Sequence, residues 1–145
     1  MHIQHSVIIG KPLGEVEAYL TDISNNQKWQ EDVLESAMIT DGTIGKGTKG
    51  YEVRSIMNFS FRTEWEVTEY TPGKSFSFAS TSSVAPYEGT FELESVESST
   101  KVTFLFTIRT SGFNALFDPV MKSVFTPRFR SNLEKLVTIL ESNTS

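Results

Sequence analysis

The spacing most suggestive of chemistry is the run from Gly45 to Gly50, GKGTKG, which has the form GxGxxG. A dinucleotide-binding run of this form follows a strand and opens a helix, whose N-terminus then holds the pyrophosphate. Here the residues that follow, YEVRS, alternate like a strand, and GKG lacks the Ser or Thr that completes a phosphate-binding P-loop. The run is therefore typical of a glycine-rich β-turn, and we expect no nucleotide cofactor.

Residues for a metal or nucleophilic centre are also scarce. The sequence contains no cysteine, and His2 and His5 are its only histidines. A zinc site needs three or four ligands, and no third ligand is suggested beside these two. No GxSxG run is present to expose a nucleophilic serine. We therefore expect no cofactor, no metal and no catalytic residue set.

Acid–base chemistry would require carboxylates that face an apolar cavity. Glu64 and Glu66 alternate with apolar residues and share a polar strand face with Arg62, which indicates solvated side chains. Alternation directs only a few polar residues inward: Ser55, Thr63, Ser80 and Tyr87. Their hydroxyls suit the orientation of a ligand, and only Tyr87 could also serve in acid–base chemistry. The weak alternation of residues 33–40 leaves open whether Glu35 joins them.

Strands and two short helices are predicted to position these residues. The helical spacing of apolar residues after Pro12 predicts helices at 13–22 and 24–32. Alternating runs predict strands at 3–9, 33–40, 48–57, 58–70, 75–82, 87–96 and 101–110. Short turns separate most of the consecutive strands, so the sequence predicts an antiparallel meander with one apolar face.

The last third of the chain, about 113–142, is predicted to be helical. Leu133, Leu136, Val137 and Leu140 form an apolar stripe. Thirty helical residues would span ~45 Å, so either Pro119 and Pro127 kink or open the helix, or the helix begins at Asp118 with Pro119 in its first turn. Because sheet and helix must both bury an apolar side, we expect the sheet to wrap around the helix.

The predicted fold is therefore α+β. A curved seven-stranded antiparallel sheet wraps around a long kinked C-terminal helix, and two short helices lie between the first and second strands. Residues 1–145 are expected to form a single domain, since 145 residues suffice for one substantial core.

Composition narrows the classes of partner. The net charge of −5 argues against nucleic-acid binding, and no signal peptide or long apolar run appears. We expect a cytoplasmic protein without membrane insertion, either a monomer or a weak dimer. Eleven phenylalanines are a large aromatic content for this length, which a close-packed core or the wall of an apolar cavity can absorb.

The element order resembles the START-like (SRPBCC) superfamily, which includes polyketide cyclase/dehydrase-like proteins and birch-pollen-allergen-type helix-grip proteins. The resemblance rests on VIIGKPLGEVEAYLTDISNNQKW, WEVTEYTPGKSFSF, the glycine of DGTIGKGTK and the closing NLEKLVTILES. It implies an apolar cavity between the sheet and the C-terminal helix, with the two short helices at one end and Trp29 packed near that end. Members of this superfamily bind lipids, sterols, polyketides, flavonoids or hormones, and some catalyse cyclisation or dehydration.

Residues expected to contact a ligand are those directed toward this cavity: Trp29, Tyr51, Val53, Phe61, Trp65, Phe76, Phe78, Ser80, Tyr87, Phe91, Phe104, Phe106, Phe117, Met121 and Phe125. The thin supply of catalytic groups favours a carrier or sensor of a hydrophobic small molecule, such as a lipid, polyketide or aromatic metabolite. The alternatives are an enzyme of the polyketide cyclase/dehydrase type and a partner-binding module. Two or more convergent ionisable side chains in the cavity would favour the enzyme.

Overall fold

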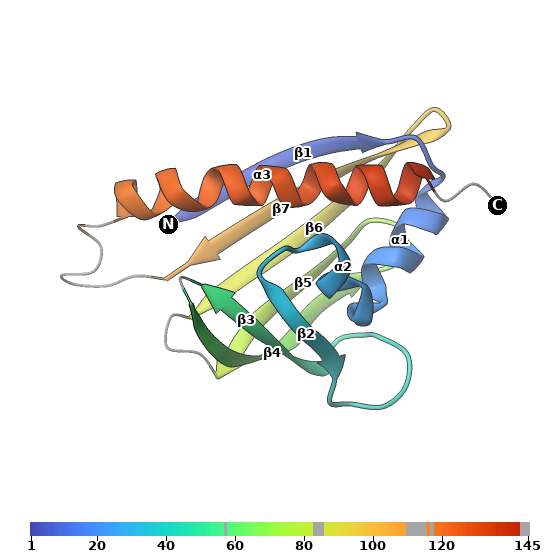
Figure 1. Ribbon diagram of the computed structural model, residues 1–145. Helices are drawn as coiled ribbons and strands as arrows, with labels where there is room; N and C mark the ends of the chain where they lie inside the picture. Colours follow the sequence, from blue (N-terminus) through green and yellow to red (C-terminus); the bar gives the residue numbers. More distant parts are fainter. Residues whose placement is uncertain (57, 83–85, 110–115, 117, 143–145) are drawn as a thin grey trace.

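One antiparallel sheet dominates the computed structural model, which describes residues 1–56, 58–82, 86–109, 116 and 118–142. Its strands are β1 His2–Ile9, β2 Val33–Met38, β3 Lys49–Ile56, β4 Phe59–Thr71, β5 Ser75–Ser82, β6 Tyr87–Val96 and β7 Ser99–Ile108. Their order in the sheet is β1-β7-β6-β5-β4-β3-β2 (Figure 1). Strands β2 to β7 therefore form the predicted meander, and β1 extends the sheet by pairing with β7.

Helical turns fill the connection between β1 and β2, as predicted: α1 Leu13–Thr21, the 3-10 turn η1 Ile23–Asn25 and α2 Asn26–Trp29. Pro12 precedes α1, where its missing N–H removes no helical hydrogen bond. Trp29 ends α2, is buried, and packs edge-to-face on Phe91 with 6.1 Å between the ring centroids. The two short helices thus carry a large aromatic side chain onto the sheet.

The C-terminal helix, α3 Asp118–Ser142, lies across the sheet (Figure 1). It begins at Asp118 with Pro119 in its first turn, and it passes Pro127 without ending. The predicted helix-grip fold is thereby confirmed, and the described helix runs from Asp118 through Pro127 to Ser142. No described helix is long and apolar enough to cross a bilayer.

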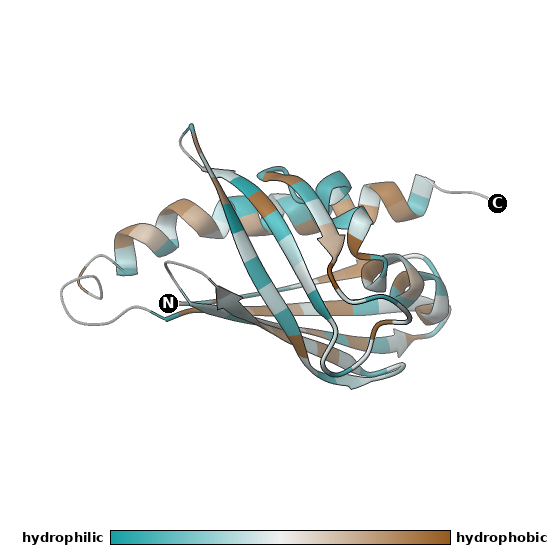
Figure 2. Ribbon diagram, turned by 90° about the horizontal axis from the view of Figure 1, so that it is seen from below, coloured by the Kyte–Doolittle hydropathy of each residue, from teal (hydrophilic) through white to brown (hydrophobic). Residues whose placement is uncertain are grey.

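Only the C-terminal half of α3 contributes buried residues to the core. These are Leu133, Leu136 and Leu140, which belong to the same core cluster as Leu20 of α1 and Val102 of β7. Residues 118–131 of the same helix include no buried residue. Brown and teal alternate along several strands in Figure 2, because one side of each strand faces the helix. The helix therefore fills one end of the apolar sheet face and leaves space at the other.

Two glycines allow aromatic rings to lie close against the sheet. A Cβ atom on Gly50 would overlap the Trp65 indole on the neighbouring strand, and one on Gly89 would overlap the Phe78 ring. Neither glycine has a positive φ, so close approach rather than backbone conformation requires them.

Candidate functional site

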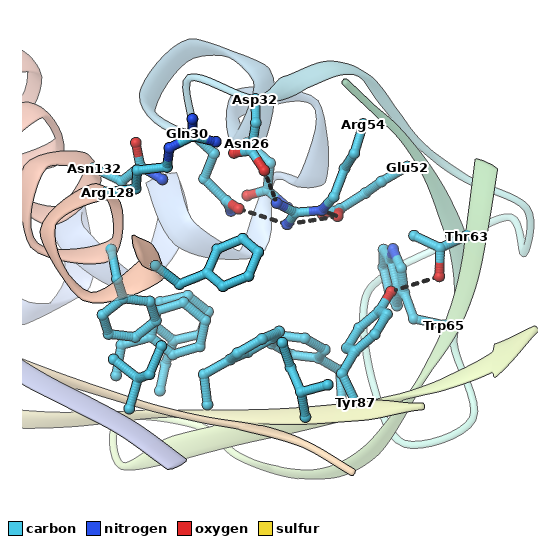
Figure 3. A pocket seen from close by; sticks show the side chains of 18 of the residues that line it. Asn26, Gln30, Asp32, Glu52, Arg54, Thr63, Trp65, Tyr87, Arg128 and Asn132 are labelled. Atoms are coloured by element: carbon cyan, nitrogen blue, oxygen red, sulfur yellow. Dashed lines mark hydrogen bonds and ion pairs between the residues drawn. The ribbon is translucent and has the colours of Figure 1, made fainter. Parts of the chain in front are cut away.

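A pocket of about 570 Å³ lies between the sheet and the N-terminal half of α3. Figure 3 shows aromatic rings on one side of it and a group of polar side chains on another. Eleven of the fifteen residues expected to contact a ligand line it: Trp29, Phe61, Trp65, Phe76, Phe78, Tyr87, Phe91, Phe104, Phe106, Met121 and Phe125. Their contact with a ligand stays a prediction, but their convergence on one pocket is a property of the structure.

The rings in the wall pack against one another. Phe91 and Phe104 stack with 4.0 Å between centroids, and Phe104 stacks on Phe129 of α3 at 4.8 Å. Phe129 lines the pocket as well, although sequence analysis did not select it. Alternation along β4, β6 and β7 aims these side chains at the same side of the sheet.

The expectation for β3 was wrong. Tyr51 and Val53 do not line the pocket, whereas Glu52 and Arg54 do. The Tyr51 hydroxyl instead donates to exposed Glu35 at 2.8 Å, which also places Glu35 outside the pocket. The guanidinium of Arg62 lies 4.0 Å from the centre of the Tyr51 ring on this outer side. The alternation of apolar residues predicted the wrong face of β3, because the charged residues Glu52 and Arg54 face inward as an ion pair.

Two serines that were predicted to face inward do not line the pocket. Ser80 lies opposite Trp65 in the sheet, but its hydroxyl accepts the backbone N–H of Tyr87 at 2.9 Å and it does not line the pocket. Ser55 also lies outside the pocket, because it alternates with Arg54 along β3. Phe117 lies outside the described residues.

Arg54 organises the polar side of the pocket. Its Nε donates to Glu52 Oε2 at 3.0 Å, one terminal nitrogen to Asp32 Oδ2 at 2.8 Å, and the other to Gln30 Oε1 at 2.8 Å (Figure 3). Asn26 donates to the second Glu52 oxygen at 3.3 Å. We call Asn26, Gln30, Asp32, Glu52 and Arg54 the polar cluster. It connects β3 to α2 and to the residue before β2.

Charge is retained in this cluster despite its burial. Burial alone would lower the pKa of Arg54, but the carboxylates of Glu52 and Asp32 raise it above its usual value. The guanidinium is therefore a permanent cation with its donors directed at its neighbours. A short signal in the sequence could have indicated this: Glu52 and Arg54 are opposite charges two residues apart on one strand, and so share a face.

A second polar pair lies beside the cluster. The Tyr87 hydroxyl and the Thr63 hydroxyl are 3.0 Å apart, on β6 and β4 (Figure 3). Burial raises the pKa of Tyr87 to about 12, and the negative charge of Glu52 adds to the rise. Tyr87 is therefore a neutral phenol at neutral pH, able to donate or accept a hydrogen bond but unable to act as a base.

This shift in pKa predicts a loss of stability in alkali. A folded-state pKa above the usual value of 10.0 means that the contribution of Tyr87 is complete below pH 10 and is lost as the pH rises toward 12. Between these limits we expect the unfolding free energy of the wild type to fall by about 1–2 kcal/mol more than that of Tyr87→Phe. Urea denaturation at several pH values in this range measures the unfolding free energy of each protein. If this free energy falls equally with pH in the wild type and in Tyr87→Phe, the prediction is wrong.

These features define the class of protein: a helix-grip fold that holds a largely aromatic pocket between its sheet and its long helix. A model of the family described as "Polyketide cyclase / dehydrase and lipid transport" matches residues 1–141. The chain belongs to this family, whose fold binds hydrophobic ligands. No curated protein matches the sequence.

Solved structures with little sequence identity share the fold. The protein TTHA0849 from Thermus thermophilus is 18% identical with a TM-score of 0.84, and all of each chain is covered. A START superfamily protein from Mycobacterium smegmatis is 11% identical with a TM-score of 0.81, over 99% of each chain. The Zhui aromatase/cyclase from Streptomyces sp. R1128 is 11% identical with a TM-score of 0.76, over 97% of this chain and 93% of that one. At these identities the similarity concerns the fold.

Proposed function

We propose that this protein binds a hydrophobic small molecule in the pocket between the sheet and α3, as a carrier or sensor. The observation that carries this proposal is the pocket wall, in which rings from four strands, α2 and α3 surround about 570 Å³. Pockets for small organic ligands usually have a volume of roughly 300–1,000 Å³ and are mainly apolar with a few polar groups. Both features are present.

The polar groups of the wall support binding more than chemistry. Arg54 is held by Glu52, Asp32 and Gln30, so its charge is balanced by its neighbours. The Tyr87 hydroxyl, which pairs with Thr63, can also meet a polar atom of a ligand. A ligand with an apolar body and one neutral polar group near this hydroxyl fits the arrangement.

The direct test is native mass spectrometry of the protein purified from its own host. A carrier or sensor is expected to retain a co-purified hydrophobic compound, which would appear as an added mass and be released by organic solvent. A clean apo mass would weaken the proposal. The fluorescent probe N-phenyl-1-naphthylamine provides a second test, because its two aromatic groups suit an apolar pocket and its emission rises on transfer from water.

Filling the pocket should weaken probe binding. Ile108 lines the pocket and is half-buried, so Ile108→Trp adds an indole to the space that a ligand would occupy. We expect the affinity for N-phenyl-1-naphthylamine to fall at least about tenfold. Ile8→Trp is the matched control, because Ile8 is exposed and lies outside the pocket. If both variants bind the probe like the wild type, the pocket is not its binding site.

An enzyme of the cyclase/dehydrase type is the second candidate, and one observation favours it. Three ionisable side chains, Asp32, Glu52 and Arg54, converge on the pocket beside the Tyr87 phenol, more than sequence analysis expected. A compound identified by mass spectrometry can be added back to apo protein and followed for conversion. Turnover that is lost in Tyr87→Phe and Glu52→Gln while binding persists would establish the enzyme. Unchanged compound would favour the carrier.

A further inference from the structure

One charge in the pocket wall differs from the rest. The charged residues that line the pocket are Asp32, Glu52, Arg54, Asp118 and Arg128. The first three pair with one another, and Asp118 lies 3.4 Å from the amino group of Met1. Within the described part of the chain, the side chain of Arg128 alone among them has no ion pair and no hydrogen bond.

The position of Arg128 places a free cation at the rim of the pocket. Arg128 is exposed and yet lines the pocket, and Asn132 lies one helical turn further along α3 and lines it too. Asn132 Oδ1 accepts the backbone N–H of Glu31 at 3.2 Å, which leaves its amide nitrogen to donate elsewhere. Figure 3 shows Arg128 and Asn132 on the α3 side, away from the Tyr87–Thr63 pair.

We propose that Arg128, with Asn132, binds an anionic group of an amphipathic ligand whose apolar body lies in the pocket. This inference rests on the proposed function and specifies the ligand as an organic acid with an aromatic or aliphatic body. A guanidinium offers a planar fork of donors that matches a carboxylate or sulfonate. The pairing also gives the ligand a direction, with its charge at the rim and its body between the rings.

The polar cluster supports the same direction. Inside the pocket the two carboxylates of Asp32 and Glu52 surround the single guanidinium of Arg54, so an anion placed there would meet an excess of negative charge. Arg54 also donates from Nε and both terminal nitrogens to neighbours. An anionic group is therefore disfavoured at the cluster and favoured at Arg128.

A matched pair of probes separates charge from shape. 8-Anilino-1-naphthalenesulfonate and N-phenyl-1-naphthylamine share the anilinonaphthalene body, and only the first carries a sulfonate. In Arg128→Gln we expect the affinity for the sulfonate to fall about three- to tenfold and that for the neutral probe to change by about twofold or less. Arg128→Lys should retain most of the affinity for the sulfonate, since it keeps the positive charge. Added salt should weaken sulfonate binding to the wild type more than to Arg128→Gln.

Arg130→Gln is the control, because it removes the same charge two residues further along the exposed helix, outside this pocket. Equal losses of sulfonate affinity in Arg128→Gln and Arg130→Gln, or no loss in either, would overturn the anion site while leaving the binding of the neutral probe intact. Binding of neither probe to the wild type would overturn the proposed function as well. Circular dichroism of each variant shows that the fold is retained.

Discussion

Replacing Arg54 by methionine is expected to lower the free energy of unfolding by about 2–4 kcal/mol. The substitution removes the cation that Glu52 and Asp32 share, and leaves two largely buried carboxylates unpaired. The loss should fall slightly below that of a fully buried pair, because about a fifth of the Arg54 and Asp32 side chains is exposed. Urea denaturation monitored by tryptophan fluorescence measures the change.

Two further variants test whether unpaired carboxylates cause this loss of stability. Arg54→Met combined with Glu52→Gln should recover about 1 kcal/mol or more, because the second change removes one of the unpaired charges. Arg62→Met is the matched control on the outer side of the sheet, where the ion pair with Glu64 is solvated, and it should cost about 1 kcal/mol or less. If Arg54→Met costs no more than Arg62→Met, the polar cluster does not stabilise the fold.

Replacing Gly50 by alanine is expected to cost about 3 kcal/mol, as overpacking of a core does at its upper range. The new methyl group would overlap the Trp65 indole, which is buried against Ile23 and Val67 and packs edge-to-face on Phe78. Either the indole moves into the pocket or β3 and β4 separate. We therefore also expect weaker binding of N-phenyl-1-naphthylamine, measured by fluorescence titration beside the unfolding experiment.

Gly14→Ala is the control for the same change of side chain. Gly14 lies in the first turn of α1, and a Cβ atom there would meet no other atom within 4 Å. Alanine should stabilise this position by up to about 1 kcal/mol, because it reduces the conformational freedom of the unfolded chain. Similar small effects of both substitutions would show that the contact between Gly50 and Trp65 does not limit packing.

The sequence by itself determined the elements and most of the pocket wall. The two-residue period of Phe61, Trp65, Phe91 and Phe104 indicated which side of each strand faces the helix, and the structure agrees. Such patterns are local, because each depends only on the alternation of side chains along one strand. The apolar stripe of Leu133, Leu136 and Leu140 on α3 is also a local pattern, because it depends only on the spacing of residues along one helix.

Only the tertiary structure decided which charges enter the pocket. Alternation in β3 favoured Tyr51 and Val53 inside, but Glu52 and Arg54 lie there because Arg54 pairs with Asp32, 22 residues earlier in the chain. The position of Arg128 at the rim likewise depends on how the helix crosses the sheet. Whether a charged side chain can be buried depends on the partners that it meets in the fold. Partners that are distant in the sequence produce no periodic pattern along a strand or helix.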